Sequence, residues 1–175
     1  MVDQEPTDLT ARVFAYGSNM CSGRFRAYGV HPRKTRIAAV LRRHRLCFNK
    51  RNTKDHSGKA NVEPHEGTDV WGVLYEIAEH ELPELIRREV GYTPRCMPVE
   101  ITPSLTLDAW VLFASTPEPN PLHPYSWYLR FLVEGAIEHH LENEYIESLR
   151  AIHAIEDPDP ERDLEKRQLE CSEND

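Results

Sequence analysis

The sequence predicts a mixed α+β domain, built as a small mixed β-barrel or curled sheet with flanking helices. Short apolar segments typical of strands come first, a short helical segment interrupts them, and longer helical segments follow, without an internal repeat. A chain of 175 residues suits one domain with a substantial core. We place this domain at residues 12–157 and expect flexible termini at 1–11 and 158–175.

Segments rich in apolar and β-branched residues predict strands at 13–16, 36–41, 44–49, 69–77, 95–102 and 109–115. Residues 50–68 are polar and contain two glycines, so we predict a loop there. Gly72 interrupts DVWGVLYEI, the clearest strand of the set. A glycine inside a strand indicates a bulge or a close backbone approach.

The helical segments follow from apolar residues at helical spacing. Residues 79–91, EHELPELIRREVG, predict a short helix that Gly91 ends. Pro124 opens a second helix, in which apolar residues recur at i, i+3, i+4 and i+7 from Tyr125 onward. A third helical segment covers residues 143–152. Beyond it the chain is highly charged and has little apolar surface to bury, so we expect a mobile tail.

Composition limits the class of protein. No apolar stretch is long enough to cross a bilayer, so no membrane partner is expected. The N-terminus MVDQEPTDLT is acidic and polar, unlike a secretory signal, which predicts a cytoplasmic protein. Cysteines stand at 21, 47, 96 and 171, with no two close in sequence. That spacing fits neither a zinc knuckle nor a redox pair, and we expect free thiols.

The net charge of -8 is unevenly distributed, since nearly every charge from Arg24 to Lys59 is basic and acids dominate from Glu134 onward. One interpretation is two solvated faces that partly neutralise each other in the fold. Another is a basic approach to an anionic substrate. Nucleic-acid binding is the third, and it is disfavoured because the overall charge is negative and no basic motif with interleaved aromatic residues is present.

Motifs for metal or nucleotide chemistry are missing or incomplete. Gly58-Lys59 lacks the remaining residues of a phosphate-binding loop, and no G-x-S-x-G motif surrounds Ser18. His139-His140, among glutamates, is the one metal-like cluster. Adjacent residues on a helix point about 100° apart, so the pair is poorly placed for one ion and a solvated helix face is expected. These motifs therefore predict no metal site.

Two other features are more informative. Residues Tyr16, Gly17, Ser18 and Asn19 follow the first strand and precede a helical segment. Backbone amides in such a turn can hold an anion, and glycine lets the backbone approach a ligand, although an ordinary turn has the same pattern. The second feature is Glu89, near the end of the helix that Gly91 closes. Alone, it would be interpreted as an exposed charge.

Together and in this order, these motifs resemble the γ-glutamylcyclotransferase family. The matching segments are FAYGSNM, DVWGVLYEI, LPELIRREVGY, WYLRFLVEGA and ENEYIESLRAI, within about residues 12–157. The resemblance implies a small mixed barrel with AIG2-like topology. It also implies an enzyme that cyclises a γ-glutamyl group to 5-oxoproline and releases the free amine. The substrate's own α-amine attacks its γ-carbonyl, so the resemblance implies that no enzymic nucleophile, metal or cofactor is needed.

The resemblance also implies roles for residues. Glu89 would act as the general acid and base. The YGSN turn would form a substrate cradle that holds the carboxylate and the developing oxyanion. Tyr128 aligns with a tyrosine that lines the family's pocket, and a core aromatic on the buried helix stripe is the alternative. Val90 separates Glu89 from Gly91-Tyr92, which leaves Glu84 as a second candidate for the acid.

The expected partner is a small-molecule γ-glutamyl compound, and no nucleic-acid partner is expected. We expect the protein itself to be a monomer or a homodimer. Arg95-Cys96 and Phe113 replace tyrosines that many relatives carry, so γ-glutamyl amino acids, glutathione and γ-glutamyl-lysine all stay open as substrates. The basic residues between 24 and 59 favour γ-glutamyl amino acids. A different class of function is a catalytically silent binding module with the same fold.

Overall fold

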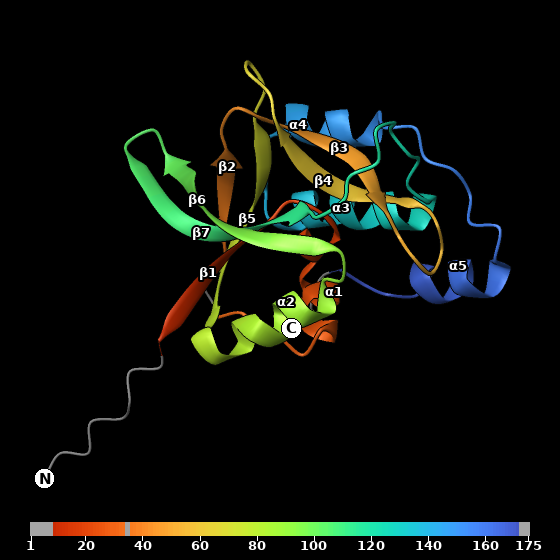
Figure 1. The fold of residues 1–175 in the computed structure, drawn as a ribbon, viewed down its shortest axis with the longest axis horizontal. Helices are drawn as coiled ribbons and strands as arrows, with labels where there is room; N and C mark the ends of the chain where they lie inside the picture. The colour runs from red at the N-terminus through yellow and green to blue at the C-terminus, as the bar shows by residue number, and fades with distance from the viewer. Residues whose placement is uncertain (1–8, 34–35, 172–175) are drawn as a thin grey trace, which may run out of the picture.

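A closed five-stranded barrel forms the centre of the molecule (Figure 1). The computed structural model of the protein describes residues 9–33 and 36–171. Neighbouring barrel strands follow the order β1 (Thr10–Ala15), β5 (Val70–Ala78), β2 (Arg36–Leu41), β6 (Tyr92–Thr102) and β7 (Leu105–Ala114). Strands β3 (His44–Arg51) and β4 (Gly58–Pro64) pair as a separate ribbon. The mixed α+β fold with a small barrel is confirmed.

The barrel is largely antiparallel and closes through one parallel contact, in which Val13 of β1 pairs with Trp110 of β7. Strand β5 lies between β1 and β2 and is mostly buried, which explains its largely apolar sequence, interrupted at the half-buried Glu76. A Cβ atom on Gly72 would lie 2.4 Å from the carbonyl oxygen of Ala15. The predicted close backbone approach is therefore present.

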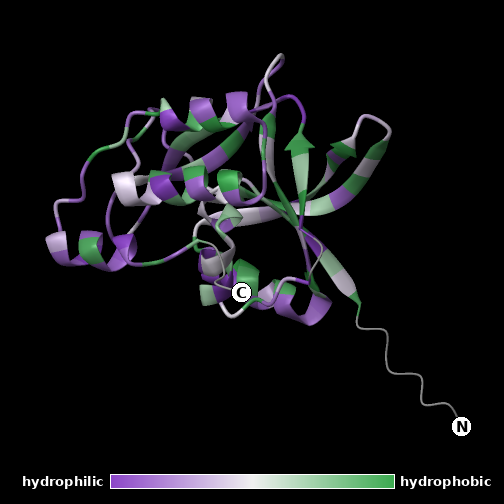
Figure 2. Cartoon of the chain, turned by 180° about the vertical axis from the view of Figure 1, so that it is seen from behind, coloured by the Kyte–Doolittle hydropathy of each residue, from purple (hydrophilic) through white to green (hydrophobic). Residues whose placement is uncertain are grey.

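Helices cover the barrel and the ribbon. Helices α3 (Ser126–Glu138) and α4 (Asn143–Arg150) pack against each other. Each of them buries apolar side chains on one face. In Figure 2 the helices alternate between hydrophobic and hydrophilic bands, as expected for helices that bury one face. The shorter elements are η1 (Ser18–Met20), α1 (Ser22–Ala27), η2 (Glu79–Glu81), α2 (Leu82–Arg88) and α5 (Pro160–Arg167). No helix in the described part of the chain is long and apolar enough to cross a membrane.

Two sequence predictions need correction. The region predicted as a loop, 50–68, contains strand β4, and its polar side chains are satisfied inside the fold: Asn61 Nδ2 donates to Asn49 Oδ1 at 2.9 Å. The segment predicted as flexible from 158 contains helix α5, which the Asp159 side chain caps by accepting two backbone N–H groups. The outer parts of both predicted flexible termini, 1–8 and 172–175, lie outside the described residues.

The expectation of four free thiols is wrong, because Cys21 and Cys171 form a disulfide across 150 positions of sequence. Cys47 and Cys96 are free. The expectation of a solvated His139 is also wrong. Its side chain is buried, and Nε2 lies 3.0 Å from the carbonyl oxygen of Met20 and 3.1 Å from the hydroxyl of Tyr75. Burial lowers the pKa of His139, so the neutral imidazole is favoured.

Candidate active site

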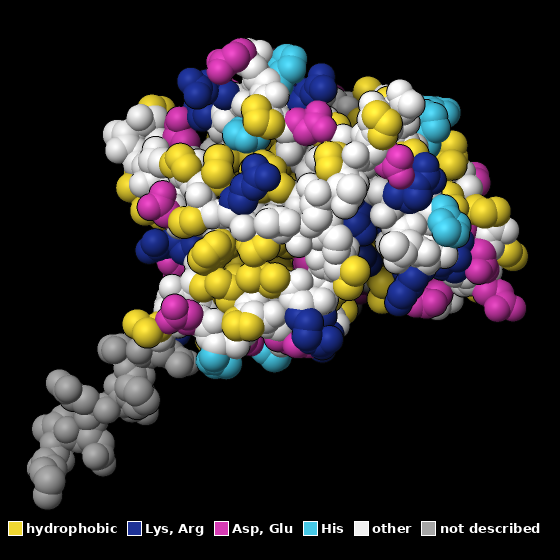
Figure 3. All heavy atoms as spheres, in the orientation of Figure 1, with side chains coloured by type: hydrophobic (Ala, Val, Ile, Leu, Met, Phe, Trp, Pro, Cys, Tyr) yellow, Lys and Arg dark blue, Asp and Glu magenta, His cyan; other side chains and the backbone are white. Residues whose placement is uncertain are grey.

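One cavity opens where β1 ends, and the candidate site residues from the sequence all line it. They are Tyr16, Gly17, Ser18, Asn19, Glu89 and Tyr128. The remaining walls come from β1, α2, Ala60 of β4, Tyr92 of β6 and Leu112 of β7. Figure 3 shows hydrophobic side chains gathered in a hollow between α2 and the strands β6 and β7. The cavity thus joins a polar turn and one carboxyl group to apolar walls.

The YGSN turn is short and tightly packed. Met20 N–H donates to the Gly17 carbonyl at 3.0 Å, which closes the 3₁₀ turn η1. The first N–H groups of such a turn have no acceptor within the turn itself. A Cβ atom on Gly17 would lie 3.2 Å from Cβ of Ala60 and 3.4 Å from the hydroxyl of Tyr128. Glycine therefore keeps this part of the cavity open.

Glu89 caps the C-terminal end of α2, and Gly91 follows in the left-handed region with φ of 84°. Asn19 Nδ2 donates to Glu89 Oε1 at 2.6 Å, although 70 positions separate the two residues. Asn19 Oδ1 is buried and has no hydrogen-bond partner among the described residues. The carboxylate and the turn are thus coupled directly, and one acceptor beside them is left for a ligand.

Burial raises the pKa of Glu89 above its ordinary value. The hydrogen bond from Asn19 and the positive charges of Arg24 and Lys50 oppose this rise. A carboxyl group with a raised pKa holds a transferred proton more readily, which suits a group that accepts a proton and returns it. Glu84, the second candidate for the acid, is partly exposed on α2 and bound by two arginines, which lower its pKa to about 2. It does not line the cavity.

Tyrosine hydroxyls form the polar part of the walls. Tyr16 donates to the Leu112 carbonyl, and Tyr92 donates to the Ala60 carbonyl at 2.7 Å. The hydroxyl of Tyr128 accepts the N–H of Ala60 at 3.1 Å. Burial raises the pKa of each of these tyrosines, which keeps the hydroxyls neutral. Tyr128 therefore lies on the buried stripe of α3 and lines the cavity as well.

Sequence reasoning missed three residues near this cavity: Tyr92, Arg24 and Lys50. Tyr92 directly follows Gly91 in the motif that carries Glu89, so its position in the motif was an available signal. Lys50 is nearly buried, and its Nζ lies 5.3 Å from the centre of the Tyr92 ring. Nothing in the basic stretch from 24 to 59 distinguishes Arg24 and Lys50 from the other cations, because only the fold brings them near Glu89.

The donor set also bears on metal binding. Within 9–33 and 36–171, no group of three or more His, Cys, Asp or Glu side chains is arranged to hold a metal ion. The cavity offers one carboxyl group, neutral hydroxyls, amides and an apolar wall. This arrangement suits proton transfer and the binding of a small polar molecule.

The chain is similar to a known protein family in sequence and to several solved structures in fold. The profile of the AIG2-like family matches residues 69–149. A solved structure of a gamma-glutamyl cyclotransferase superposes with a TM-score of 0.78 at 21% identity, covering 91% of this chain and 99% of that one. An uncharacterized protein from Homo sapiens superposes with a TM-score of 0.76 at 22% identity, with the same coverage. No curated protein sequence matches the chain significantly.

YkqA from Bacillus subtilis is a third structural relative, with a TM-score of 0.70 and 25% identity. The superposition covers 93% of this chain and 56% of YkqA. The chain therefore has a γ-glutamylcyclotransferase-like fold with a carboxyl group in its cavity. Its resemblance to the γ-glutamylcyclotransferase and AIG2-like family is confirmed.

Proposed function

We propose that this protein is a γ-glutamylcyclotransferase. It converts the γ-glutamyl group of γ-glutamyl amino acids or amines to 5-oxoproline and releases the free amine. The observation that carries the proposal is the pair Asn19–Glu89, in which a carboxyl group of raised pKa is bonded to the YGSN turn inside one cavity. The family-level resemblance supports the same activity.

The reaction begins when the substrate's α-ammonium gives a proton to the Glu89 carboxylate. The free amine nitrogen attacks the γ-carbonyl carbon and forms a five-membered ring. The amide bond to the amine portion then breaks as Glu89 returns the proton to the leaving nitrogen. The ring nitrogen gives its second proton to Glu89, which passes it to the released amine and is a carboxylate again. Ring closure within one bound molecule can be worth an effective molarity of about 10⁵–10⁸ M, so the enzyme needs to orient the substrate rather than supply a nucleophile.

The YGSN turn orients the substrate in this proposal. Its amides hold the substrate carboxylate and stabilise the oxyanion that develops on the γ-carbonyl oxygen. The unpartnered Oδ1 of Asn19 accepts a hydrogen bond from the substrate ammonium, next to the carboxylate that removes the proton. Ala60 and Tyr128 limit the room beside Gly17, so the cavity selects a slim, extended γ-glutamyl chain.

The choice of amine portion depends on the surroundings of Glu89. Arg24 and Lys50 add positive charge on this side of the fold, which favours γ-glutamyl compounds with a second carboxylate. A cyclotransferase from yeast that is specific to glutathione shares the fold with a TM-score of 0.58 at 15% identity. Glutathione therefore belongs among the substrates to test, beside γ-glutamyl amino acids.

The test is a product assay. The wild-type protein and Glu89→Gln are incubated with γ-glutamyl-alanine, glutathione and γ-glutamyl-lysine, and 5-oxoproline is quantified by mass spectrometry. Product from the wild type and not from the variant supports the proposal and ranks the substrates. Saturable binding of a γ-glutamyl compound without any 5-oxoproline contradicts it, and assigns the protein to the class of catalytically silent binding modules.

A further inference from the structure

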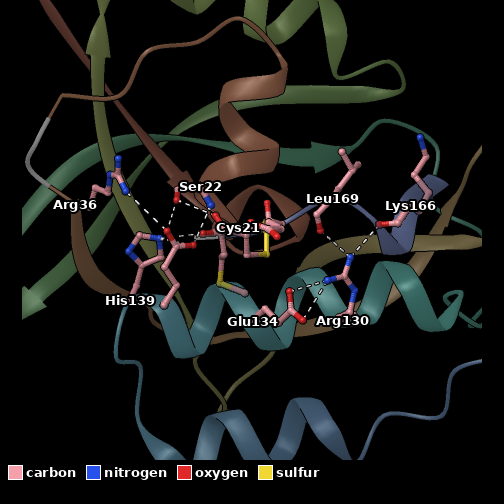
Figure 4. Close-up of a disulfide and its surroundings, with 12 residues drawn as sticks. Cys21, Ser22, Arg36, Arg130, Glu134, His139, Lys166 and Leu169 are labelled. Atoms are coloured by element: carbon pink, nitrogen blue, oxygen red, sulfur yellow. Dashed lines mark hydrogen bonds and ion pairs between the residues drawn. A yellow bond between two sulfur atoms is a disulfide. The ribbon is translucent and has the colours of Figure 1, made fainter. Parts of the chain in front are cut away.

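A disulfide connects the candidate site to the C-terminal end of the described chain. Cys21 directly follows η1, whose residue Asn19 contacts Glu89, and it is bonded to Cys171 (Figure 4). Both cysteines are buried. The covalent bond therefore lies two residues from the side chain that positions the carboxyl group.

The C-terminal segment is fitted closely to the start of α1. The carbonyl of Cys171 accepts the N–H of Gly23 at 2.8 Å and the hydroxyl of Ser22 at 3.2 Å. A Cβ atom on Gly23 would lie 2.3 Å from the carbonyl oxygen of Glu170, so only glycine permits this approach. The segment is thus part of the packing around the YGSN turn and not a free tail.

Helix α3 holds the same segment from the other side. Arg130 Nη2 donates to the carbonyls of Lys166 and Leu169, at 2.9 Å each, as Figure 4 shows. Glu138, near the end of α3, accepts the N–H of Ser22 at 3.0 Å. All of these contacts are non-covalent, and the disulfide adds a covalent cross-link between this segment and the residue at the end of η1.

The YGSN turn has a second support behind it. The Met20 carbonyl accepts hydrogen bonds from the Tyr75 hydroxyl at 2.9 Å and from His139 Nε2 at 3.0 Å. Met20 and Cys21 are therefore fixed from the barrel side by hydrogen bonds and from the C-terminal side by the disulfide. Asn19 immediately precedes Met20 and lies two residues before Cys21, so its distance to Glu89 depends on both supports.

We propose that the Cys21–Cys171 disulfide is a redox-sensitive positioning device for the Asn19–Glu89 pair, and that its reduction lowers cyclotransferase activity. This inference rests on the proposed function. Reduction by a small dithiol transfers two electrons and two protons. The S–S bond breaks, two cysteine thiols form, and the dithiol becomes a cyclic disulfide. The freed segment separates from α1 more often, and Asn19 is less often in place to bond Glu89.

Activity in the two redox states tests the inference. The oxidised protein, with Cys47 and Cys96 as its free thiols, should show two maleimide-reactive thiols after denaturation, and the reduced protein should show all four. We expect kcat/KM for γ-glutamyl-alanine to fall roughly tenfold on reduction with dithiothreitol, because catalysis by orientation is sensitive to small displacements. Cys171→Ser should show the lower value with or without dithiothreitol. Cys96→Ser, at an exposed free cysteine, should respond as the wild type does.

Two further measurements separate positioning from a general loss of stability. The Asn19 bond lowers the pKa of Glu89, so reduction should move the acidic limb of the pH profile of kcat/KM to higher pH. In Asn19→Ala the positioned side chain is missing, and reduction should leave kcat/KM unchanged. Equal, non-zero activity in both redox states contradicts this inference alone. A confirmed disulfide with no 5-oxoproline in either state contradicts both the proposed function and the inference.

Discussion

The amide of Asn19 and the carboxyl group of Glu89 lie 2.6 Å apart, joined by a hydrogen bond between a turn that follows the first strand and the end of helix α2. This bond places the proton-transfer group of the proposed reaction against the backbone that is proposed to hold the substrate. A displacement of either the Glu89 carboxyl group or the YGSN turn should therefore affect the other.

Glu89→Gln should lower kcat by about 10²–10⁴-fold, the usual contribution of a positioned acid or base. Glutamine keeps the size of the side chain but cannot accept the proton of the substrate ammonium. The matched control is Glu84→Gln, five residues earlier on α2 and outside the cavity, where kcat should stay within about twofold. Steady-state kinetics decide between the two carboxyl groups, and loss of activity in the Glu84 variant alone would exchange their roles.

The pH dependence of kcat/KM should show an acidic limb that reports Glu89. Burial raises the pKa of Glu89, and the unprotonated form is needed first, so activity should be lost as pH falls through that raised value. Lys50→Met removes a positive charge that opposes the rise, so the limb should move to higher pH. Lys54→Met is the control, because Lys54 is exposed and does not perturb Glu89. Coincident profiles for all three proteins would rule out a role for Lys50.

Gly17→Val should lower kcat/KM about tenfold or more, because the new side chain occupies space next to Ala60 and the Tyr128 hydroxyl. Gly67→Ala provides the comparison, since nothing lies within 4 Å but φ is 85°. That variant should cost about 1 kcal/mol of unfolding free energy and leave kcat/KM intact. Urea unfolding and kinetics, measured on both variants, distinguish a blocked cavity from a strained backbone.

A buried ion pair in the β3–β4 ribbon should affect stability. Lys59 Nζ donates to Asp55 Oδ2 at 2.9 Å and to Ser57 Oγ at 2.8 Å, and both charged side chains are less than 10% exposed. Lys59→Met leaves the Asp55 carboxylate buried without its partner, so we expect a loss of about 3 kcal/mol in unfolding free energy. Asp55→Asn combined with Lys59→Met should recover part of this loss in urea titrations. Lys59→Met alone being as stable as the wild type would contradict this prediction.

The same lysine gives a pH-dependent stability. Burial lowers the pKa of Lys59 to about 8 from an ordinary value of 10.5. Between these two values the unfolded chain binds more protons at this site than the folded protein does. Unfolding free energy should therefore gain a rising contribution with pH across that window, and Lys59→Met should lack it. Chemical unfolding at several pH values measures how steeply the unfolding free energy depends on pH in the wild type and in Lys59→Met. Between pH 8 and 10.5 the wild type should show the larger increase.

Apolar runs, turn glycines and helical spacing are local patterns, and they predicted the mixed α+β fold with a small barrel or curled sheet. The YGSN turn is weak as a pattern alone, and it was singled out as a site through the family resemblance. Strand β4 was missed because its polar residues are satisfied by distant partners, such as Asn61 with the N–H of Ala114, and it has no apolar alternation. The Cys21–Cys171 bond was missed because spacing carries no information on pairing across 150 positions. The contact from Asn19 to Glu89 likewise needs the fold.

The disulfide has one more consequence, which concerns the integrity of the chain. Residues 21–171 form a covalent ring, closed by the backbone and one S–S bond. A protease that cuts once in an exposed loop of this ring, such as the segment between β7 and α3, releases no fragment. The disulfide keeps the two parts of the nicked chain joined. Cleavage of the oxidised protein therefore becomes visible on a denaturing gel only after a reductant opens the ring.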